Sequence, residues 1–314
     1  MARTRYAPDR GLTARMTLTM FLLGAVFVGF VVALVFILSA VHASNAAIVF
    51  FPIVLGLGLG IGSLYYSDKI ALRAAGAQVV TPQQAPELHG IIDRICALAD
   101  MPKPVVAISP VMMPNAFATG RNSQHTVICV TKGLLKPGML DREELEGVLA
   151  HEMSHVAHKD VVVMTIASFL GIIAGLLVRF AFYSELFGGG RRGGNNNNGG
   201  ALPVMLIIML VSIVVYAISF LLIRLLSRYR ELAADRSGAL LTGQPSKLAS
   251  ALQKVSGDIA RIPSRDLRDA EALNAFYFAP AITSGQSLAT LFSTHPSLER
   301  RLRELDKISE QLGR

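Results

Sequence analysis

One stretch of the sequence, LAHEMSHVAHKDV, contains two histidines four positions apart, with a glutamate directly after the first. On an α-helix, residues four apart lie on one face, so His151 and His155 can direct imidazole nitrogens at a single ion. Two neutral imidazoles suit zinc well. Glu152 would lie beside the ion, where its carboxylate can take a proton from an attacking water and give it to a leaving amine. The spacing therefore predicts a zinc hydrolase with two histidine ligands and a glutamate as base.

The third metal ligand must come from elsewhere, because the motif lacks the glycine and third histidine of the longer metzincin pattern. Glu231 in SRYRELAADRSG is the best candidate, since it follows an apolar run much as the histidines precede one. Asp235, four residues later, would accept a hydrogen bond from the ring N–H of a ligand histidine. The alternative for both carboxylates is a salt bridge to nearby arginines such as Arg230 or Arg236. His295 in FSTHPSLERRL could act at the open coordination position or stabilise an oxyanion, although a histidine that simply begins a helix fits equally well.

The composition indicates a membrane protein, because 52% of the 314 residues are hydrophobic, 17% are charged and the mean hydropathy is +0.48. Four apolar runs are long enough to predict transmembrane helices, which need roughly 20 residues. They are residues 16–40, 46–66, 161–182 and 202–223. Flanking cations predict that the polar parts of the chain face the cytoplasm. Arg191 and Arg192 fall on the other side, so a second pair that packs into the protein or only dips into the bilayer is an alternative.

These spans divide the chain into four predicted segments. Residues 1–72 form an N-terminal membrane hairpin, residues 73–160 the first part of a cytoplasmic zinc protease domain with the His-Glu-x-x-His motif, residues 161–226 a second hydrophobic hairpin with a Gly- and Asn-rich loop, and residues 227–314 the second part of the protease domain with the third ligand. The expected fold class is α+β and mainly helical. It is a membrane-embedded gluzincin with four transmembrane helices and a small sheet in the catalytic domain.

Local patterns predict the elements of the polar segments. Residues 85–99 have helical spacing, whereas 103–109 and 125–131 read as strands. Asp141 followed by Glu144 indicates a capping box at the start of the motif helix, and Ser297 is the predicted N-cap of the last helix.

A protease must also hold its substrate in an extended conformation. The stretch NAFATG, before the strand at 125–131, offers an exposed edge for β-augmentation. Asn115, Ala116 and Phe117 are therefore the predicted substrate-binding residues. An ordinary edge strand closed by a turn is the alternative.

The segments PNAFATG, LEGVLAHEMSHVAHKDV, RELAAD and THPSLERRL, in this order with spans between them, closely resemble the HtpX zinc metalloproteases over almost the whole chain. The resemblance implies kinship with the CAAX prenyl proteases, a multi-pass location in the bacterial plasma (inner) membrane, a cytoplasmic active site and a role in membrane-protein quality control under stress. It also implies one Zn²⁺ per chain, bound by His151, His155 and Glu231, with Glu152 as catalytic base. Met153 and the GGNNNNGG loop depart from the family pattern without touching this chemistry.

The predicted function is a zinc-dependent endopeptidase that cleaves misfolded or damaged membrane proteins at the cytoplasmic face. Its expected partners are polypeptide substrates and membrane lipid. No nucleic-acid partner is expected, because many of the cations behind the net charge of +8 flank the apolar runs, and the oligomeric state is left open. One alternative is a prenyl-protein protease, although two pairs of spans offer no obvious large chamber. Another is a membrane scaffold with structural zinc, although such sites favour four closed protein ligands and three are visible here.

Overall fold

The computed structural model describes residues 10–40, 54, 58, 60–62, 64–188, 201–260 and 295–313. The chain divides into two compact units. The polar unit consists of Met1–Ala14, Leu64–Val162 and Ser227–Arg314, and the apolar unit of Arg15–Ser63 and Val163–Leu226. The helices are α1 (Arg10–Ala40), α3 (Ser67–Ala74), α4 (Pro86–Ala99), α5 (Arg142–Ala157), α6 (Asp160–Gly188), α7 (Ala201–Thr242), α8 (Pro245–Ala260) and α11 (Leu298–Gln311), and the strands are β1 (Gln78–Val79), β2 (Val105–Ser109), β3 (Ala116–Asn122) and β4 (His125–Thr131).

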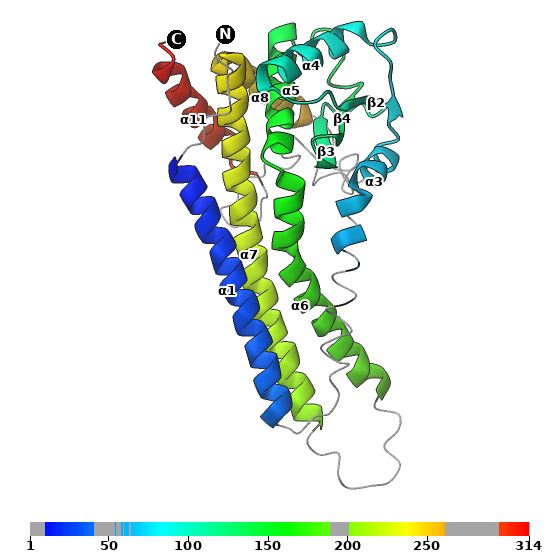
Figure 1. Ribbon diagram of the computed structural model, residues 1–314, viewed down its shortest axis with the longest axis vertical. Coiled ribbons are helices and arrows are strands. Elements are labelled where there is room, and N and C mark those ends of the chain that lie inside the picture. Colours follow the sequence, from blue (N-terminus) through cyan, green and yellow to red (C-terminus); the bar gives the residue numbers. More distant parts are fainter. Residues whose placement is uncertain are drawn as a thin grey trace. The chain divides into compact units, whose positions relative to one another are not determined.

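The apolar unit is built from α1, α6 and α7, which run side by side (Figure 1). Their contact is a cluster of large aliphatic and aromatic side chains. Phe30 and Leu34 of α1 pack there with Ile173 of α6 and Ile208 of α7. Many outward side chains are as apolar as the buried ones, and Phe36 is 74% exposed. Such a surface is costly in water and suits hydrocarbon.

Three helices in the described part of the chain are long and apolar enough to cross a membrane, whereas the sequence predicts four. These three contain the predicted runs 16–40, 161–182 and 202–223. The remaining run, residues 46–66, lies largely outside the described residues. The structure therefore corrects the prediction to three candidate spans among the residues it describes.

The polar unit contains a four-stranded sheet in the order β1-β2-β4-β3. β2 and β4 are parallel and the two outer pairs are antiparallel. The predicted strands at 103–109 and 125–131 are confirmed as β2 and β4. The NAFAT stretch belongs to a longer strand than expected, because β3 pairs with β4 from Ala116 opposite Val130 as far as Asn122 opposite His125. β3 is thus an edge strand.

Helices cover both faces of this sheet. On one face, Ala116 and Ile128 join a core that includes side chains from α4, α5 and α8. On the other face, Phe117 and Cys129 pack against Ala71 of α3. Neighbouring strand residues point to opposite faces, so this alternation follows from the sequence of each strand.

Helix α5 carries the His-Glu-x-x-His motif, and its ends are sharply defined. At its start, Asp141 Oδ1 accepts a hydrogen bond from Glu144 N and Glu144 Oε2 accepts one from Asp141 N, each at 2.8 Å. This confirms the predicted capping box. At its end, Lys159 has a φ of 56°, which breaks the helix before α6 begins at Asp160. The predicted cap of α11 is confirmed too, since the Ser297 side chain accepts from Arg300 N.

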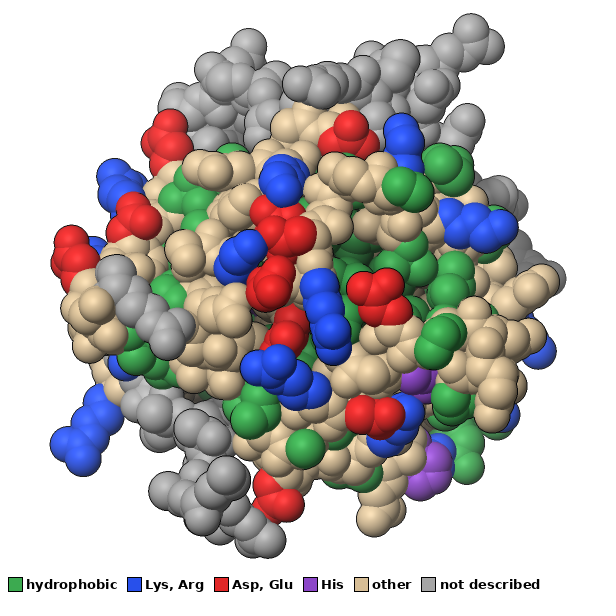
Figure 2. All heavy atoms as spheres, turned by 90° about the horizontal axis from the view of Figure 1, so that it is seen from above, with side chains coloured by type: hydrophobic (Ala, Val, Ile, Leu, Met, Phe, Trp, Pro, Cys, Tyr) green, Lys and Arg blue, Asp and Glu red, His purple; other side chains and the backbone are tan. Residues whose placement is uncertain are grey.

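The surface seen in Figure 2 carries Asp and Glu side chains interspersed with Lys and Arg, among scattered apolar side chains. Such mixing of charges is typical of a protein surface that faces water.

Candidate metal centre

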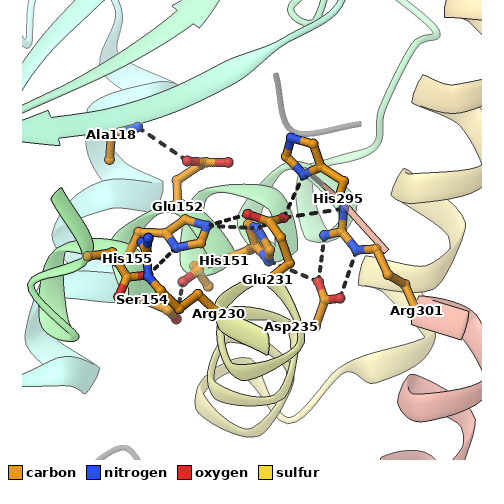
Figure 3. A network of polar contacts seen from close by, with 12 residues as sticks. Ala118, His151, Glu152, Ser154, His155, Arg230, Glu231, Asp235, His295 and Arg301 are labelled. Carbon is orange, nitrogen blue, oxygen red and sulfur yellow. Dashed lines mark hydrogen bonds and ion pairs between the residues drawn. The ribbon is translucent and has the colours of Figure 1, made fainter. Parts of the chain in front are cut away.

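Three potential ligands meet in the polar unit, two from α5 and one from α7 (Figure 3). The Nε2 atoms of His151 and His155 lie 3.2 Å apart. A Glu231 carboxylate oxygen lies 3.6 Å from the first of these nitrogens, and the other oxygen lies 3.5 Å from the second. Two atoms bound tetrahedrally to one zinc at about 2.0 Å lie about 3.3 Å apart. The spacing and the nitrogen and oxygen donors therefore fit a zinc ion.

A carboxylate holds the far side of each imidazole. His151 Nδ1 lies 2.9 Å from Asp235 Oδ1, and His155 Nδ1 lies 2.6 Å from Asp160 Oδ2. An ionised carboxylate only accepts hydrogen bonds, so each Nδ1 carries a proton and each Nε2 is directed at the ligand cluster. This arrangement fixes both rings in the tautomer that binds metal through Nε2.

In the metal-free protein, the carboxylates of Asp235 and Glu231 favour the protonated form of His151. Burial alone would lower the pKa of His151, but the contacts with Asp235 and Glu231 outweigh burial and raise the pKa to about 9. At neutral pH a metal ion must therefore displace a proton from this ring.

Each carboxylate is in turn paired with an arginine. Arg301 of α11 is only 1% exposed and contacts both oxygens of Asp235, with Nε to Oδ2 at 2.7 Å and Nη2 to Oδ1 at 2.6 Å. Arg230 Nη2 lies 2.6 Å from Asp160 Oδ2. These pairs compensate the cost of burying the carboxylates beside the rings.

Sequence reasoning missed Asp160 and Arg301. Asp160 had a usable signal, because it follows His155 by five positions at the point where the charged helix gives way to the apolar run. Arg301 had none, since its contact with Asp235 joins positions 66 residues apart. The alternative pairing of Asp235 with Arg230 or Arg236 is replaced by the contact with Arg301.

Glu152 lies next to the ligands and is 5% exposed. Burial raises the pKa of its carboxyl, and the nearby charges of His151 and His155 offset part of this effect. Its Oε2 accepts a hydrogen bond from the Ala118 N–H of β3 at 3.2 Å. A buried carboxyl with a raised pKa holds a proton more readily, which suits a group that takes up and releases one.

His295 also reaches the ligand cluster. Its Nδ1 lies 3.1 Å from Glu231 Oε2 (Figure 3). His295 stands just before α11, the helix that also carries Arg301, so the last part of the chain brings both side chains to Glu231 and Asp235.

The edge of β3 faces Glu152 through its backbone. Asn115 accepts a hydrogen bond from Thr131 N at 2.9 Å, so its carbonyl points toward β4. Backbone groups alternate along a strand, and those of Ala116, Ala118 and Gly120 therefore point to the outer edge. The Ala118 N–H bond to Glu152 agrees with this register.

The predicted substrate-binding residues are only partly on this edge. As whole residues, Asn115, Ala116 and Phe117 are 3%, 0% and 4% exposed, so none of their side chains can contact a substrate from outside. Of the three, only Ala116 turns its backbone outward. Because Ala116 is fully buried, the accessible outward backbone groups are those of Ala118 and Gly120, which are partly exposed.

A His-His-Glu metal cluster, a buried glutamate beside it and an edge strand along it, with three candidate membrane helices among the described residues, define a membrane metallopeptidase of the gluzincin type. The sequence model of peptidase family M48 matches residues 82–309. The chain belongs to peptidase family M48 and is an HtpX homologue, a multi-pass membrane zinc metalloprotease, which confirms the resemblance seen in its motifs.

Relatives align along nearly all of the chain. Protease HtpX homolog 1 of Streptomyces coelicolor is 58% identical over 312 residues, which are 99% of this chain and 97% of the relative. Protease HtpX homolog of Moorella thermoacetica is 49% identical over 99% of this chain and 98% of its own length. The homolog of Pyrococcus furiosus is 39% identical over 80% of this chain and 83% of its own length.

Proposed function

We propose that this protein is an endopeptidase that cleaves misfolded or damaged membrane proteins at the cytoplasmic face of the plasma membrane. In this proposal His151, His155 and Glu231 bind one Zn²⁺ per chain, and Glu152 is the catalytic base. The convergence of the two Nε2 atoms and the Glu231 carboxylate, each imidazole held by its own carboxylate, is the observation that carries the proposal.

The residues have distinct tasks in hydrolysis. Bound zinc supplies Lewis acidity to the attacking water and to the scissile carbonyl. Glu152 takes the proton that the water loses and delivers it to the leaving amine, and its raised pKa suits both steps. We assign His295 to stabilising charge on the carbonyl oxygen, because its ring lies beside the ligand Glu231, with Nδ1 3.1 Å from Oε2.

An extended substrate would lie along the outer edge of β3. The partly exposed backbone groups of Ala118 and Gly120 offer the hydrogen bonds of an added strand, and the Ala118 N–H is already directed at the catalytic glutamate. Recognition through backbone groups depends little on the substrate side chains. Broad selection of unfolded segments, as quality control requires, is consistent with this edge.

The membrane arrangement is also part of the proposal. Cations that flank the apolar runs support cytoplasmic placement of both protease segments, 73–160 and 227–314, each of which follows a hairpin, at 1–72 and 161–226 respectively. The run at 46–66 would be a fourth span beside the three candidate helices. Relatives from Methanosarcina and Pyrococcus extend the family beyond bacteria, and we propose a bacterial plasma membrane for this chain on its likeness to the Streptomyces relative.

The test compares wild type with Glu152→Gln in detergent, after metal removal and with or without added zinc, on an unfolded membrane-protein substrate. Matched zinc content in the two proteins ensures that any difference comes from the carboxylate. We expect zinc-dependent cleavage by wild type and a loss of roughly 100- to 10,000-fold in the variant.

Two results would overturn the proposal. No cleavage by wild type despite bound zinc would indicate a scaffold with a structural ion. Cleavage that requires a prenyl group on the substrate would instead indicate a CAAX-type prenyl protease, so paired substrates with and without this group belong in the assay.

A further inference from the structure

Helix α3 packs on one face of the sheet and leaves its other side exposed. Ala71 and Ala75 are buried against Phe117 of β3 and its neighbours. On the exposed side, Tyr66 and Ile70 stand one turn apart and are 50% and 54% exposed. The outward side of α3 therefore combines exposed apolar residues with the exposed cations Lys69 and Arg73.

Sheet residues extend this exposed apolar surface. Val79 pairs with Ala107, whose side chain is buried beneath α3, so the Val79 side chain projects from the same sheet face and is 58% exposed. Val105 stands two positions before Ala107 on the same face and is 47% exposed. We call the exposed apolar residues on this side of the unit the α3 surface: Tyr65, Tyr66, Ile70, Val79 and Val105.

Cations accompany these residues. The Arg121 guanidinium carbon lies 4.3 Å from the centre of the Tyr65 ring, and Lys69 Nζ lies 5.7 Å from that of Tyr66. Arg73 is also on α3, which has a single acidic residue, Asp68. Tyrosines and aliphatic side chains therefore stand here beside three cations, Lys69, Arg73 and Arg121, and one acidic residue, Asp68. That combination is typical of protein at a membrane interface.

We propose that the α3 surface lies against the lipid headgroups and that Lys69, Arg73 and Arg121 bind anionic lipid there. Tyrosine rings and aliphatic side chains would enter the interfacial layer, while the cations meet the phosphates. A protein partner would need acidic groups to match the same cations, whereas an anionic bilayer supplies them next to every multi-pass protein.

The contact would act on the substrate-binding edge. Phe117, beneath α3, and Arg121, stacked on Tyr65, both belong to β3, and Ala118 between them donates to Glu152. Lipid docking of α3 therefore holds the strand that would receive the substrate. This consequence rests on the proposed function, whereas lipid contact itself does not.

The sequence contains no tryptophan, so a single introduced one reports its own surroundings. Ile70→Trp places it on the α3 surface. Met112→Trp is the matched control, because Met112 is 65% exposed but follows the opposite end of β2 from the β3–β4 turn, which Arg121 of β3 closely precedes. Full-length proteins are reconstituted with lipids brominated near the headgroup, and zinc content verifies the fold. Tyr66→Trp is the second reporter if Ile70→Trp does not fold.

We expect brominated lipid to quench the reporter at position 70 and not the one at position 112. Quenching should increase when phosphatidylglycerol is added to phosphatidylcholine. Replacing Lys69 or Arg121 by Gln should shift the docking equilibrium about fivefold each. Quenching by aqueous iodide alone would place the surface in water and overturn the proposal. Protection from both quenchers would mean that protein covers it and would equally overturn it.

Discussion

His151 and His155 are each held between a ligand position and a carboxylate, and each carboxylate is held by an arginine. The two chains, His151–Asp235–Arg301 and His155–Asp160–Arg230, come from different parts of the sequence but have the same order of groups. Because the rings cannot turn without breaking these contacts, the geometry of the cluster is set before metal arrives.

Asp235→Asn tests whether the Asp235 carboxylate orients the His151 ring for metal binding, because it changes a single side-chain atom. The amide keeps the size of the side chain but loses the charge that balances Arg301 and supports His151. We expect zinc affinity to fall roughly 10- to 100-fold, measured by competition with a chromophoric chelator. Asp93→Asn is the control, since Asp93 forms an exposed pair with Lys103, and unchanged affinity is expected there.

Arg301 and Asp235 should behave as a coupled pair in unfolding. Arg301→Met leaves a buried carboxylate without its partner, which costs about 3–5 kcal/mol. Arg301→Met combined with Asp235→Leu removes both charges, and the loss should be smaller than the sum of the two single losses. Denaturation of the four proteins in detergent gives the coupling. Additive losses would show that the two side chains act independently.

At this scale, the sequence predicts what lies within one helical turn. The spacing of His151, Glu152 and His155 needs only the helical period, and Glu231 needs the further step that an apolar hairpin returns the chain. The contact of Arg301 depends on how α11 packs against α7, which no local pattern encodes. A buried arginine also looks like a surface one in sequence, because its partner is invisible there.

At the scale of elements, helices α5 and α7 pack so closely at the metal centre that no further side-chain atom fits between them. A methyl group on Gly238 would lie 2.9 Å from the backbone nitrogen of His151, so this glycine allows the two ligand helices to approach. Gly147 of α5 makes another close contact, away from the ligands. A methyl group there would lie 3.3 Å from the Leu248 backbone of α8.

The two glycines give a matched pair of variants. Gly238→Ala must shift α7 away from His151, and we expect both lower stability and weaker zinc binding. Gly147→Ala should change stability less, because its closest contact is looser and alanine favours the helix, while zinc affinity stays near the wild-type value. Chelator competition and thermal unfolding measure the two properties separately. Equal zinc affinity in both variants would contradict the role assigned to the α5–α7 contact.

The start of α5 should make stability depend on pH. Burial raises the pKa of Glu144, but Lys254, Ser250 and the backbone of Asp141 outweigh burial and hold this pKa below its ordinary value of 4.5. The ionised carboxylate therefore stabilises the fold fully above pH 4.5, and this contribution is lost as the pH falls through the lower folded value.

Glu144→Gln isolates this effect, since glutamine still completes a capping box but cannot pair with Lys254. The variant should unfold at lower temperature than wild type at neutral pH, and the two curves should converge as the pH falls below 4.5. A constant difference at every pH would mean that the ion pair does not contribute.

The sequence predicts where strands lie along the chain better than it predicts their order in the sheet. The composition of 103–109 and the alternation in 125–131 are enough to predict β2 and β4, although β4 is buried on both faces. The order β1-β2-β4-β3 depends on packing against α3 and α5, and with it the register that turns Ala118 rather than Asn115 toward Glu152. A register shifted by one residue would turn the backbone groups of Asn115 outward and those of Ala118 toward β4. The direction of these groups is therefore known only from the folded sheet.

Over the whole molecule, the polar unit is assembled from chain segments on either side of α6 and the first part of α7. Composition predicts this interruption, because apolar runs longer than a bilayer is thick cannot belong to the same core as charged helices. Zinc would then connect the segments, since His151 and His155 precede the apolar run and Glu231 follows it.

Removing zinc should therefore loosen the polar unit and leave the apolar unit unchanged. An ion that binds only the folded protein at about 1,000 times its Kd stabilises it by about 4 kcal/mol. Hydrogen exchange of metal-stripped protein should show faster exchange in residues 142–157 and 227–242, and unaltered exchange in residues 206–223. His155→Ala should exchange like stripped wild type and ignore added zinc, whereas His125→Ala, at an exposed histidine outside the cluster, should respond as wild type does. Equal loosening of both units would mean that zinc acts on the fold as a whole, and no loosening would mean that the two segments hold together without it.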